Sequence, residues 1–143
     1  MKILIGIDTG VHTGFAVAFD HGEGGVLQKV ECHSITQAMQ NVLEYEDEYD
    51  LKDIMLYIED ARQRTWFTGG REKAQGVGSV KRDAQIWEDW CTEQGLNFKM
   101  IHPAANATKL KVEDFKRRTG WTGRTNEHAR DAAMLVFKRY WKA

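Results

Sequence analysis

The sequence predicts an α/β fold in which helices flank a mixed five-stranded sheet. The first 33 residues contain three short apolar or alternating runs separated by turn residues, which is typical of an antiparallel meander. Two later apolar runs, 54–58 and 98–101, each follow a helical segment, which favours parallel strands. The chain has 143 residues, 42% of them hydrophobic, enough for a buried core. We therefore expect one domain spanning residues 1–143.

The first strand, residues 3–7, is a continuous apolar run of the kind buried on both faces of a sheet. It ends in Asp8, and Gly10 and Gly14 follow closely. An ionised carboxylate at that place needs a cation or hydrogen-bond donors, and the glycines allow a ligand or backbone to approach. One interpretation is that Asp8 caps the amides of a turn. The other is a functional site completed by later parts of the chain.

The following elements are predicted from periodicity and caps. Residues 15–19 and 26–33 form the second and third strands, with a hairpin turn at 21–25. A helix follows from a cap at Ser34 or Thr36 through about Tyr49. Its buried stripe comprises Ala38, Met39, Val42, Leu43 and Tyr45. The strand at 54–58 ends in Glu59 and Asp60, a second carboxylate site at a strand end.

A polar, basic segment follows at residues 61–76 and leads into an amphipathic helix over 75–94. Arginines and lysines surround Trp66 and Phe67 in this segment, a pattern that suits phosphates and unpaired bases, although a loop tryptophan can also pack against its own domain. The helix 75–94 has a wide apolar face that fits either the core or a dimer interface. Its stripe comprises Val77, Val80, Ala84, Trp87, Trp90 and Cys91.

Residues 98–101 form the fifth strand, and a basic helix is expected over Thr108–Arg118. The last helix, capped by Thr125 or Asn126, runs through about Tyr140. Near its start, His128 and Asp131 are three residues apart and project from one face. An isolated H-x-x-D pattern is weak evidence, but it follows one strand that ends in Asp and another that ends in Glu.

Composition limits the functional classes. The net charge is only −1, yet residues 1–60 hold 3 Lys or Arg against 12 Asp or Glu, whereas residues 61–143 hold 17 against 9. This asymmetry favours a polyanion bound on one face, although two solvated faces of opposite charge would give the same counts. No apolar run has the length of a membrane span. Cys32 and Cys91 have neither metal-ligand nor disulfide spacing, so we expect reduced thiols and a cytoplasmic protein.

The element order is that of an RNase H-like fold, and within it the chain resembles the RuvC-type Holliday junction resolvases. The resemblance rests on I-G-I-D-T-G with Gly14, on Y-I-E-D, and on N-E-H-A-R-D-A-A. It implies a homodimeric DNA endonuclease that cuts four-way junctions with two Mg²⁺ per active site. The homodimer would form through the 75–94 helix. Each motif alone is short, but they occur in the family's order and cover almost the whole domain.

The resemblance also implies roles for individual residues. Asp8, Glu59 and Asp131 would be the carboxylate ligands and His128 a further ligand, with Glu127 as the alternative to His128. Hard oxygen ligands suit Mg²⁺, and a histidine among them favours Mn²⁺ as a substitute. One ion would lower the pKa of the attacking water while the other stabilises the leaving 3′-oxygen.

Basic and aromatic residues would bind the DNA. Lys109 and Lys116 resemble the family's catalytic lysines near the scissile phosphate. The family inserts an aromatic residue just after the strand glutamate, whereas this chain has none until Trp66 or Phe67, so the way in which it would open a junction differs. The expected DNA-binding residues are Arg62, Arg64, Trp66, Phe67, Arg71, Lys73, Lys111, Arg117 and Arg118.

Three other functions fit parts of the pattern. A nuclease of the same fold could act on RNA:DNA hybrids, flaps or damaged DNA, but ribonucleases H typically place this glutamate on a helix, whereas Glu59 ends a strand. A sugar-kinase or actin-type ATPase needs a duplicated domain, which 143 residues do not supply. A non-catalytic DNA-structure-binding module would not need four intact site positions.

Overall fold

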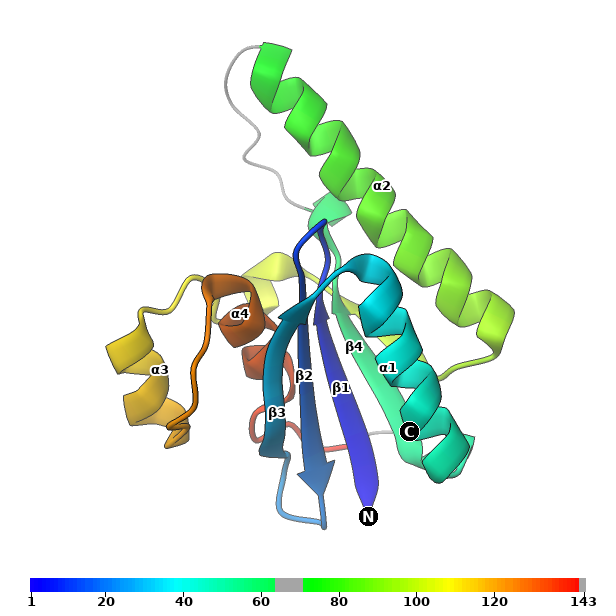
Figure 1. Ribbon diagram of the computed structural model, residues 1–143, viewed down its shortest axis with the longest axis vertical. Helices are drawn as coiled ribbons and strands as arrows, with labels where there is room; N and C mark the ends of the chain where they lie inside the picture. Colours follow the sequence, from blue (N-terminus) through cyan, green and yellow to red (C-terminus); the bar gives the residue numbers. More distant parts are fainter. Residues whose placement is uncertain (64–70, 142–143) are drawn as a thin grey trace.

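Five strands form one mixed sheet in the order β3-β2-β1-β4-β5 (Figure 1). They are β1 (Lys2–Asp8), β2 (Thr13–Asp20), β3 (Val26–His33), β4 (Ile54–Glu59) and β5 (Phe98–Ile101). Strand β2 is antiparallel to β1 and β3, whereas β1, β4 and β5 are mutually parallel. The computed structural model describes residues 1–63 and 71–141, with only the backbone of 71–77, 79 and 80. The predicted sheet, three antiparallel strands followed by two parallel ones, is therefore confirmed.

The central strand β1 places the first carboxylate. Its side chains Ile3, Leu4, Ile5 and Ile7 have no exposed surface, because β1 lies between β2 and β4 and is covered on both faces. Ile7 of β1 pairs with Ile58 of β4 in a parallel register. The carboxyl ends of parallel neighbours meet at the same edge of a sheet, so Asp8 and Glu59 end adjacent strands side by side.

Helices cover both faces of the sheet (Figure 1). On one face α1 (Ile35–Glu48) and α2 (Arg71–Gln94) pack against the odd-numbered residues of β1. On the other face α3 (Val112–Thr119) and α4 (Glu127–Val136) share a core cluster with Leu4 and Tyr57. The N-terminal half of α2 projects beyond the sheet (Figure 1). The alternation of side chains along β1 thus divides the hydrophobic core into two layers.

Three glycines allow α4 to lie directly on the sheet. A Cβ built on Gly14 would lie 2.0 Å from the backbone oxygen of His128, and one on Gly6 would lie 2.2 Å from that of Ala132. Gly25 has the same relation to Val136, also at 2.2 Å. The three carbonyls are spaced four residues apart, one per helical turn. Any side chain at these glycines would push α4 outwards, so they fix its height and its register above the sheet.

Most predicted elements are present, and three helix ends differ. The first helix is capped by Ser34, whose side chain accepts a hydrogen bond from Gln37. Helix α2 begins at residue 71 rather than 75, and α3 begins at residue 112 rather than 108. The later start of α3 follows from Lys109, whose φ of 57° is incompatible with a right-handed helix. Helix α4 ends at Val136 instead of about Tyr140, because Lys138 also has a φ of 57° and its amide bonds Gly25.

The cysteines are free thiols, Cys32 half-buried and Cys91 buried in the core. Burial raises the pKa of Cys91 to about 12, so its thiol stays protonated at neutral pH. Within residues 1–63 and 71–141, no helix combines the length and the apolar character that crossing a bilayer requires.

Candidate metal centre and its surroundings

Three buried carboxylates from distant parts of the chain meet at one edge of the sheet. Asp8 ends β1, Glu59 ends β4, and Asp131 lies in the second turn of α4. Each contributes an oxygen atom to a group whose members all lie within 4.8 Å of one another. Their exposures are only 6%, 1% and 6%. Since oxygen atoms are the preferred ligands of hard divalent cations, this cluster could hold a metal ion.

Asp131 shows the electrostatic cost of gathering these carboxylates. The pKa of Asp131 is raised to about 6, chiefly by burial, and the nearby charges of Glu59 and Glu127 contribute to this rise. The backbone amide of Lys109 and the side chain of His128 act in the opposite direction without cancelling the effect. A bound cation would remove the proton and restore the charged form, so the donor set fits a divalent ion.

His128 lies at the rim of this cluster and contacts Asp8. Its Nδ1 is 3.2 Å from Asp8 Oδ2, and its side chain is 47% exposed. The ring of His12, in the turn between β1 and β2, lies 6.1 Å from the ring of His128. Glu127 lines the same small cavity, of about 200 Å³, together with Asp8, His128 and Asp131. Both predicted alternatives for a further ligand are therefore within this cavity.

Lys109 also lines the cavity, and its backbone is fixed to Asp131. Its amide donates a 2.8 Å hydrogen bond to Asp131 Oδ1. Asn106 donates its side-chain amide to the backbone oxygen of Asp131 at 3.1 Å. Arg130 reaches the backbone oxygen of Leu110 at 2.8 Å. The segment 106–110 is thereby attached to the first two turns of α4. No sequence pattern indicated Asn106 or Arg130, because their contacts here are with backbone oxygens.

The remaining predicted cations of this region lie on or next to α3. Lys111 directly precedes α3, and Lys116, Arg117 and Arg118 lie in its last turn. All four are exposed, and Arg117 pairs with Asp114 on the same helix at 2.7 Å. None of the four lines the carboxylate cavity. Of the two lysines predicted to be catalytic, only Lys109 lines that cavity.

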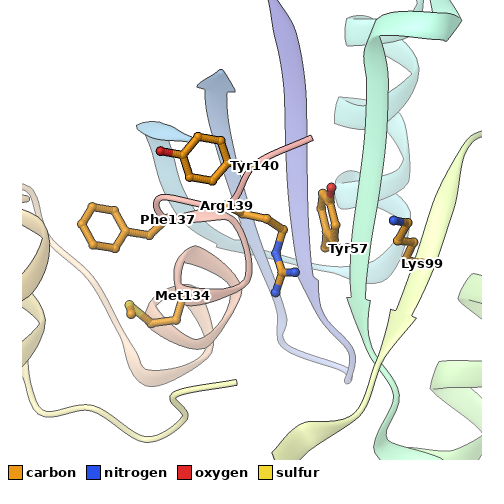
Figure 2. A pocket seen from close by; sticks show the side chains of 6 residues that line it. All are labelled: Tyr57, Lys99, Met134, Phe137, Arg139 and Tyr140. Atoms are coloured by element: carbon orange, nitrogen blue, oxygen red, sulfur yellow. The ribbon is translucent and has the colours of Figure 1, made fainter. Parts of the chain in front are cut away.

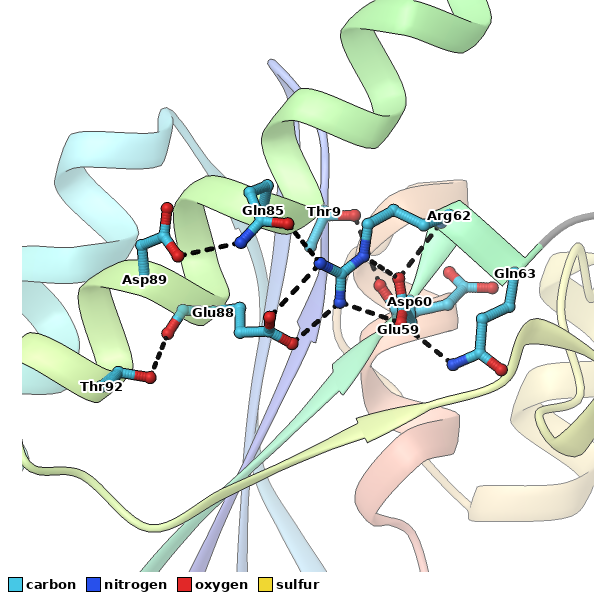
Figure 3. Close-up of polar contacts among 9 residues, drawn as sticks. All are labelled: Thr9, Glu59, Asp60, Arg62, Gln63, Gln85, Glu88, Asp89 and Thr92. Carbon is cyan, nitrogen blue, oxygen red and sulfur yellow. Dashed lines mark hydrogen bonds and ion pairs between the residues drawn. The ribbon is translucent and has the colours of Figure 1, made fainter.

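Arg62, predicted to bind DNA, is engaged by acidic side chains (Figure 3). Its Nε donates to Asp60 at 2.7 Å, and its terminal nitrogens reach Glu88 at 2.8 Å and Gln85 at 2.6 Å. Burial opposes ionisation of Asp60, but hydrogen bonds from Arg62 and Gln63 outweigh it and hold its pKa below the ordinary value. Arg62 thus joins the segment after Glu59 to α2. This arrangement offers a structural role that competes with the predicted DNA contact.

The other predicted DNA-binding residues of segment 61–76 have no described side-chain contacts. Arg64, Trp66 and Phe67 lie outside the described residues. Arg71 and Lys73 belong to the first turn of α2, where only the backbone is described. Their roles stay predictions from the sequence.

Comparison with known proteins supports the fold. No protein-family model matches the sequence, and no curated protein matches it. Among solved structures, that of Thermus thermophilus RuvC superimposes with a TM-score of 0.51 and 17% sequence identity, over 94% of this chain and 91% of that chain. At this identity the likeness is one of fold, and it covers nearly all of both chains. The chain therefore has the RNase H-like fold of RuvC, with a buried acidic cluster that could bind metal.

Proposed function

We propose that this protein is a metal-dependent endonuclease that hydrolyses phosphodiester bonds in branched DNA, with the four-way junction as its substrate. The observation that carries this proposal is the convergence of Asp8, Glu59 and Asp131 within 4.8 Å at one edge of the sheet. The RuvC-like fold supports it, and so do the exposed cations on α3. The whole chain, residues 1–143, would form one nuclease domain.

The proposed ligands are Asp8, Glu59 and Asp131, with His128 or Glu127 completing the set around two Mg²⁺ or Mn²⁺ ions. Bound divalent ions supply an activated water and stabilise the leaving oxygen of the phosphodiester. The chain's own residues orient the site. His128 contacts one oxygen of Asp8, while the amide of Lys109 fixes one oxygen of Asp131. These contacts hold two of the three carboxylates in defined orientations before any ion binds.

Lys109 and Lys116 are proposed to contact the scissile phosphate, and the neighbouring cations are proposed to bind the flanking phosphates. Lys109 lines the carboxylate cavity, which supports its place next to the reacting group. Lys116 lies on the exposed last turn of α3, outside the carboxylate cavity, so its proposed contact with the scissile phosphate rests on the resemblance alone. Lys111, Arg117 and Arg118 extend the same positive surface. Binding to this surface should weaken steeply with salt, because each phosphate contact releases counterions.

A substrate panel in three buffers tests the proposal. Labelled four-way junctions, flaps, RNA:DNA hybrids and plain duplex are incubated with Mg²⁺, with Mn²⁺ and with chelator, and the products are separated on gels. We expect paired cuts in the junction that require a divalent ion. Cleavage of hybrids or flaps in preference to junctions would transfer the assignment to another nuclease of this fold. Absence of metal-dependent cleavage on every substrate would leave a DNA-binding module.

Variants of the two rim residues identify the further ligand. If His128 is the ligand, His128→Gln should lower cleavage far more than Glu127→Gln, and the reverse holds if Glu127 is the ligand. Both side chains are exposed, but His128→Gln also removes the 3.2 Å contact with the buried Asp8. Metal affinity measured by calorimetry on the free protein gives the same comparison without DNA.

We further propose that the protein is a homodimer formed through the 75–94 helix and that it acts in the cytoplasm. The projection of α2 beyond the sheet and the 39% exposure of Ile86 support an interface there (Figure 1). Sedimentation equilibrium measures the assembly state directly. An Ile86→Glu substitution should convert the dimer to a monomer, and an unchanged dimer would place the interface elsewhere.

A further inference from the structure

The segment 106–110 passes the candidate metal centre without belonging to a helix or a strand. It lies between the short 3₁₀ turn Pro103–Ala105 and α3. Lys109 of this segment lines the carboxylate cavity, and its backbone amide donates to Asp131 Oδ1 at 2.8 Å. A segment outside regular secondary structure keeps one position only where other groups hold it. The groups that hold this segment therefore decide where the Lys109 amide lies.

Lys109 has a backbone conformation that needs such support. Its φ of 57° lies in the left-handed region, which is unfavourable for a residue with a Cβ. In the described part of the chain, Lys138 is the one other non-glycine residue with a positive φ. A residue keeps this conformation where the surrounding contacts over-determine it. Contacts on both sides of Lys109 are therefore expected.

Two side chains supply these contacts, one on each side of Lys109. Before it, Asn106 donates its side-chain amide to the backbone oxygen of Asp131 at 3.1 Å. After it, the backbone oxygen of Leu110 accepts a hydrogen bond from Arg130 Nε at 2.8 Å. A terminal nitrogen of Arg130 also donates to Thr125 Oγ1 at 2.9 Å, which fixes the guanidinium. Because residues 130 and 131 are consecutive in α4, one turn of one helix holds the segment at both ends.

We propose that Asn106 and Arg130 are positioning residues of the metal centre, which hold the Lys109 amide on Asp131 so that this carboxylate is already oriented when a divalent ion binds. Neither side chain lines the carboxylate cavity, so both act through the backbone of the segment. Partners that orient the ligands of a metal commonly change its affinity about tenfold or more when they are removed. The role towards the ion rests on the proposed function, whereas the hold on the Lys109 amide can be measured without metal.

The chain offers a matched control for each of the two residues. Arg139, beyond the other end of α4, likewise donates its Nε to a backbone oxygen, that of Leu135. It lines a cavity of about 350 Å³ that shares no lining residue with the carboxylate cavity (Figure 2). Asn97 directly precedes β5 and donates its side-chain amide to the backbone oxygen of Leu51 at 3.1 Å. Because β5 runs parallel to β4, Asn97 lies at the sheet edge opposite the carboxylates.

Hydrogen exchange of the Lys109 amide tests the hold on the segment in the absence of metal. The ¹⁵N-labelled chain is studied by NMR in chelator. Asn106→Ala and Arg130→Gln should each make this amide exchange about tenfold faster than in the wild type, because each removes one of the two anchors. The controls Asn97→Ala and Arg139→Gln remove similar contacts elsewhere and should leave its exchange within about twofold.

Calorimetry with Mn²⁺ on the free protein tests the role towards the ion. Asn106→Ala and Arg130→Gln should each weaken binding about tenfold, and the two controls should change it by less than about twofold. The direction is decisive for Arg130. Loss of a nearby positive charge should by itself tighten the binding of a cation, whereas loss of a positioning contact weakens it. Thr125→Val, which removes only one contact of Arg130, replaces Arg130→Gln if that variant does not fold, and should weaken binding about threefold.

The outcomes separate this inference from the proposed function. Faster exchange of the Lys109 amide together with weaker Mn²⁺ binding in both variants supports it. Unchanged exchange in both variants, or Mn²⁺ binding equal to that of the wild type in both, overturns this inference alone. A wild type that binds no Mn²⁺ overturns the proposed function and this inference together.

Discussion

Replacing Asp131 by asparagine is expected to stabilise the metal-free protein above pH 6 and to change it little near pH 4. Asp131 is 6% exposed, and burial among other carboxylates raises its pKa to about 6 from an ordinary value of 3.8. The folded state therefore binds this proton more tightly than the unfolded state. The stability that the proton provides is complete below the unfolded pKa and is lost as the pH rises through about 6.

The size of the effect follows from the pKa difference. A difference of about 2 units, at about 1.4 kcal/mol per unit, makes the ionised form cost about 3 kcal/mol at pH 8. Asparagine does not titrate, and its side-chain oxygen can still accept the Lys109 amide. For a chain of this length, 3 kcal/mol corresponds to roughly 10 °C in Tm.

Urea denaturation of wild type and Asp131→Asn in chelator, from pH 4 to pH 8, measures this difference. We expect the stability gain of the variant to grow with pH and to level off above about pH 7. Adding Mg²⁺ or Mn²⁺ should stabilise the wild type and not the variant, because ion binding favours the folded state. A gain of equal size at pH 4 and pH 8, or a loss at pH 8, would refute the electrostatic reasoning.

Three further changes test other parts of the structure. Asp8→Asn should abolish cleavage but leave junction binding within a fewfold in a gel-shift assay, because cations away from the carboxylates supply most of the affinity; cleavage near the wild-type rate would remove Asp8 from the mechanism. Gly14→Ala should lower the free energy of unfolding in urea by about 2 to 3 kcal/mol and weaken metal binding, because its Cβ would lie 2.0 Å from a backbone oxygen of α4. In the control Gly78→Ala the Cβ meets nothing within 4 Å, so stability should be unchanged or slightly higher. Arg62→Gln and Glu88→Gln should each lower the free energy of unfolding, with a coupling energy of about 1 kcal/mol in a double-mutant cycle. Neither should change the salt dependence of DNA binding, and a salt slope reduced by about one in Arg62→Gln alone would make Arg62 a phosphate contact.

The sequence predicted the strands and the acidic positions because both have local signatures. Apolar runs marked β1 and β4, and each ends in the carboxylate that the structure brings to the cluster. Because β1 and β4 pair in parallel, Asp8 and Glu59 lie next to each other at the same edge of the sheet. The position of Asp131 next to these two carboxylates has no local signature, because glycines of β1, β2 and the turn after β2 set the register of α4 on the sheet.

Other features could not be predicted because they depend on how distant segments meet. Arg62 has a local partner in Asp60, but its bond to Glu88 depends on the rotation of α2, which no local pattern specifies. The left-handed conformation of Lys109, which delays the start of α3, is stabilised by an acceptor 22 residues further along the chain. The cavity around Arg139 arises where the chain leaves α4 beside β4 and β5, so its lining has no spacing pattern in the sequence.

The hydrogen bond from the Lys109 amide to Asp131 has a consequence for substrate recognition. One oxygen of this carboxylate is already committed to the main chain, so a cation must share it or approach from the other oxygen. In either case a shift of the carboxylate towards an ion draws the backbone of Lys109 with it. Under the proposed function, metal binding at Asp131 and the position of Lys109 would therefore be coupled.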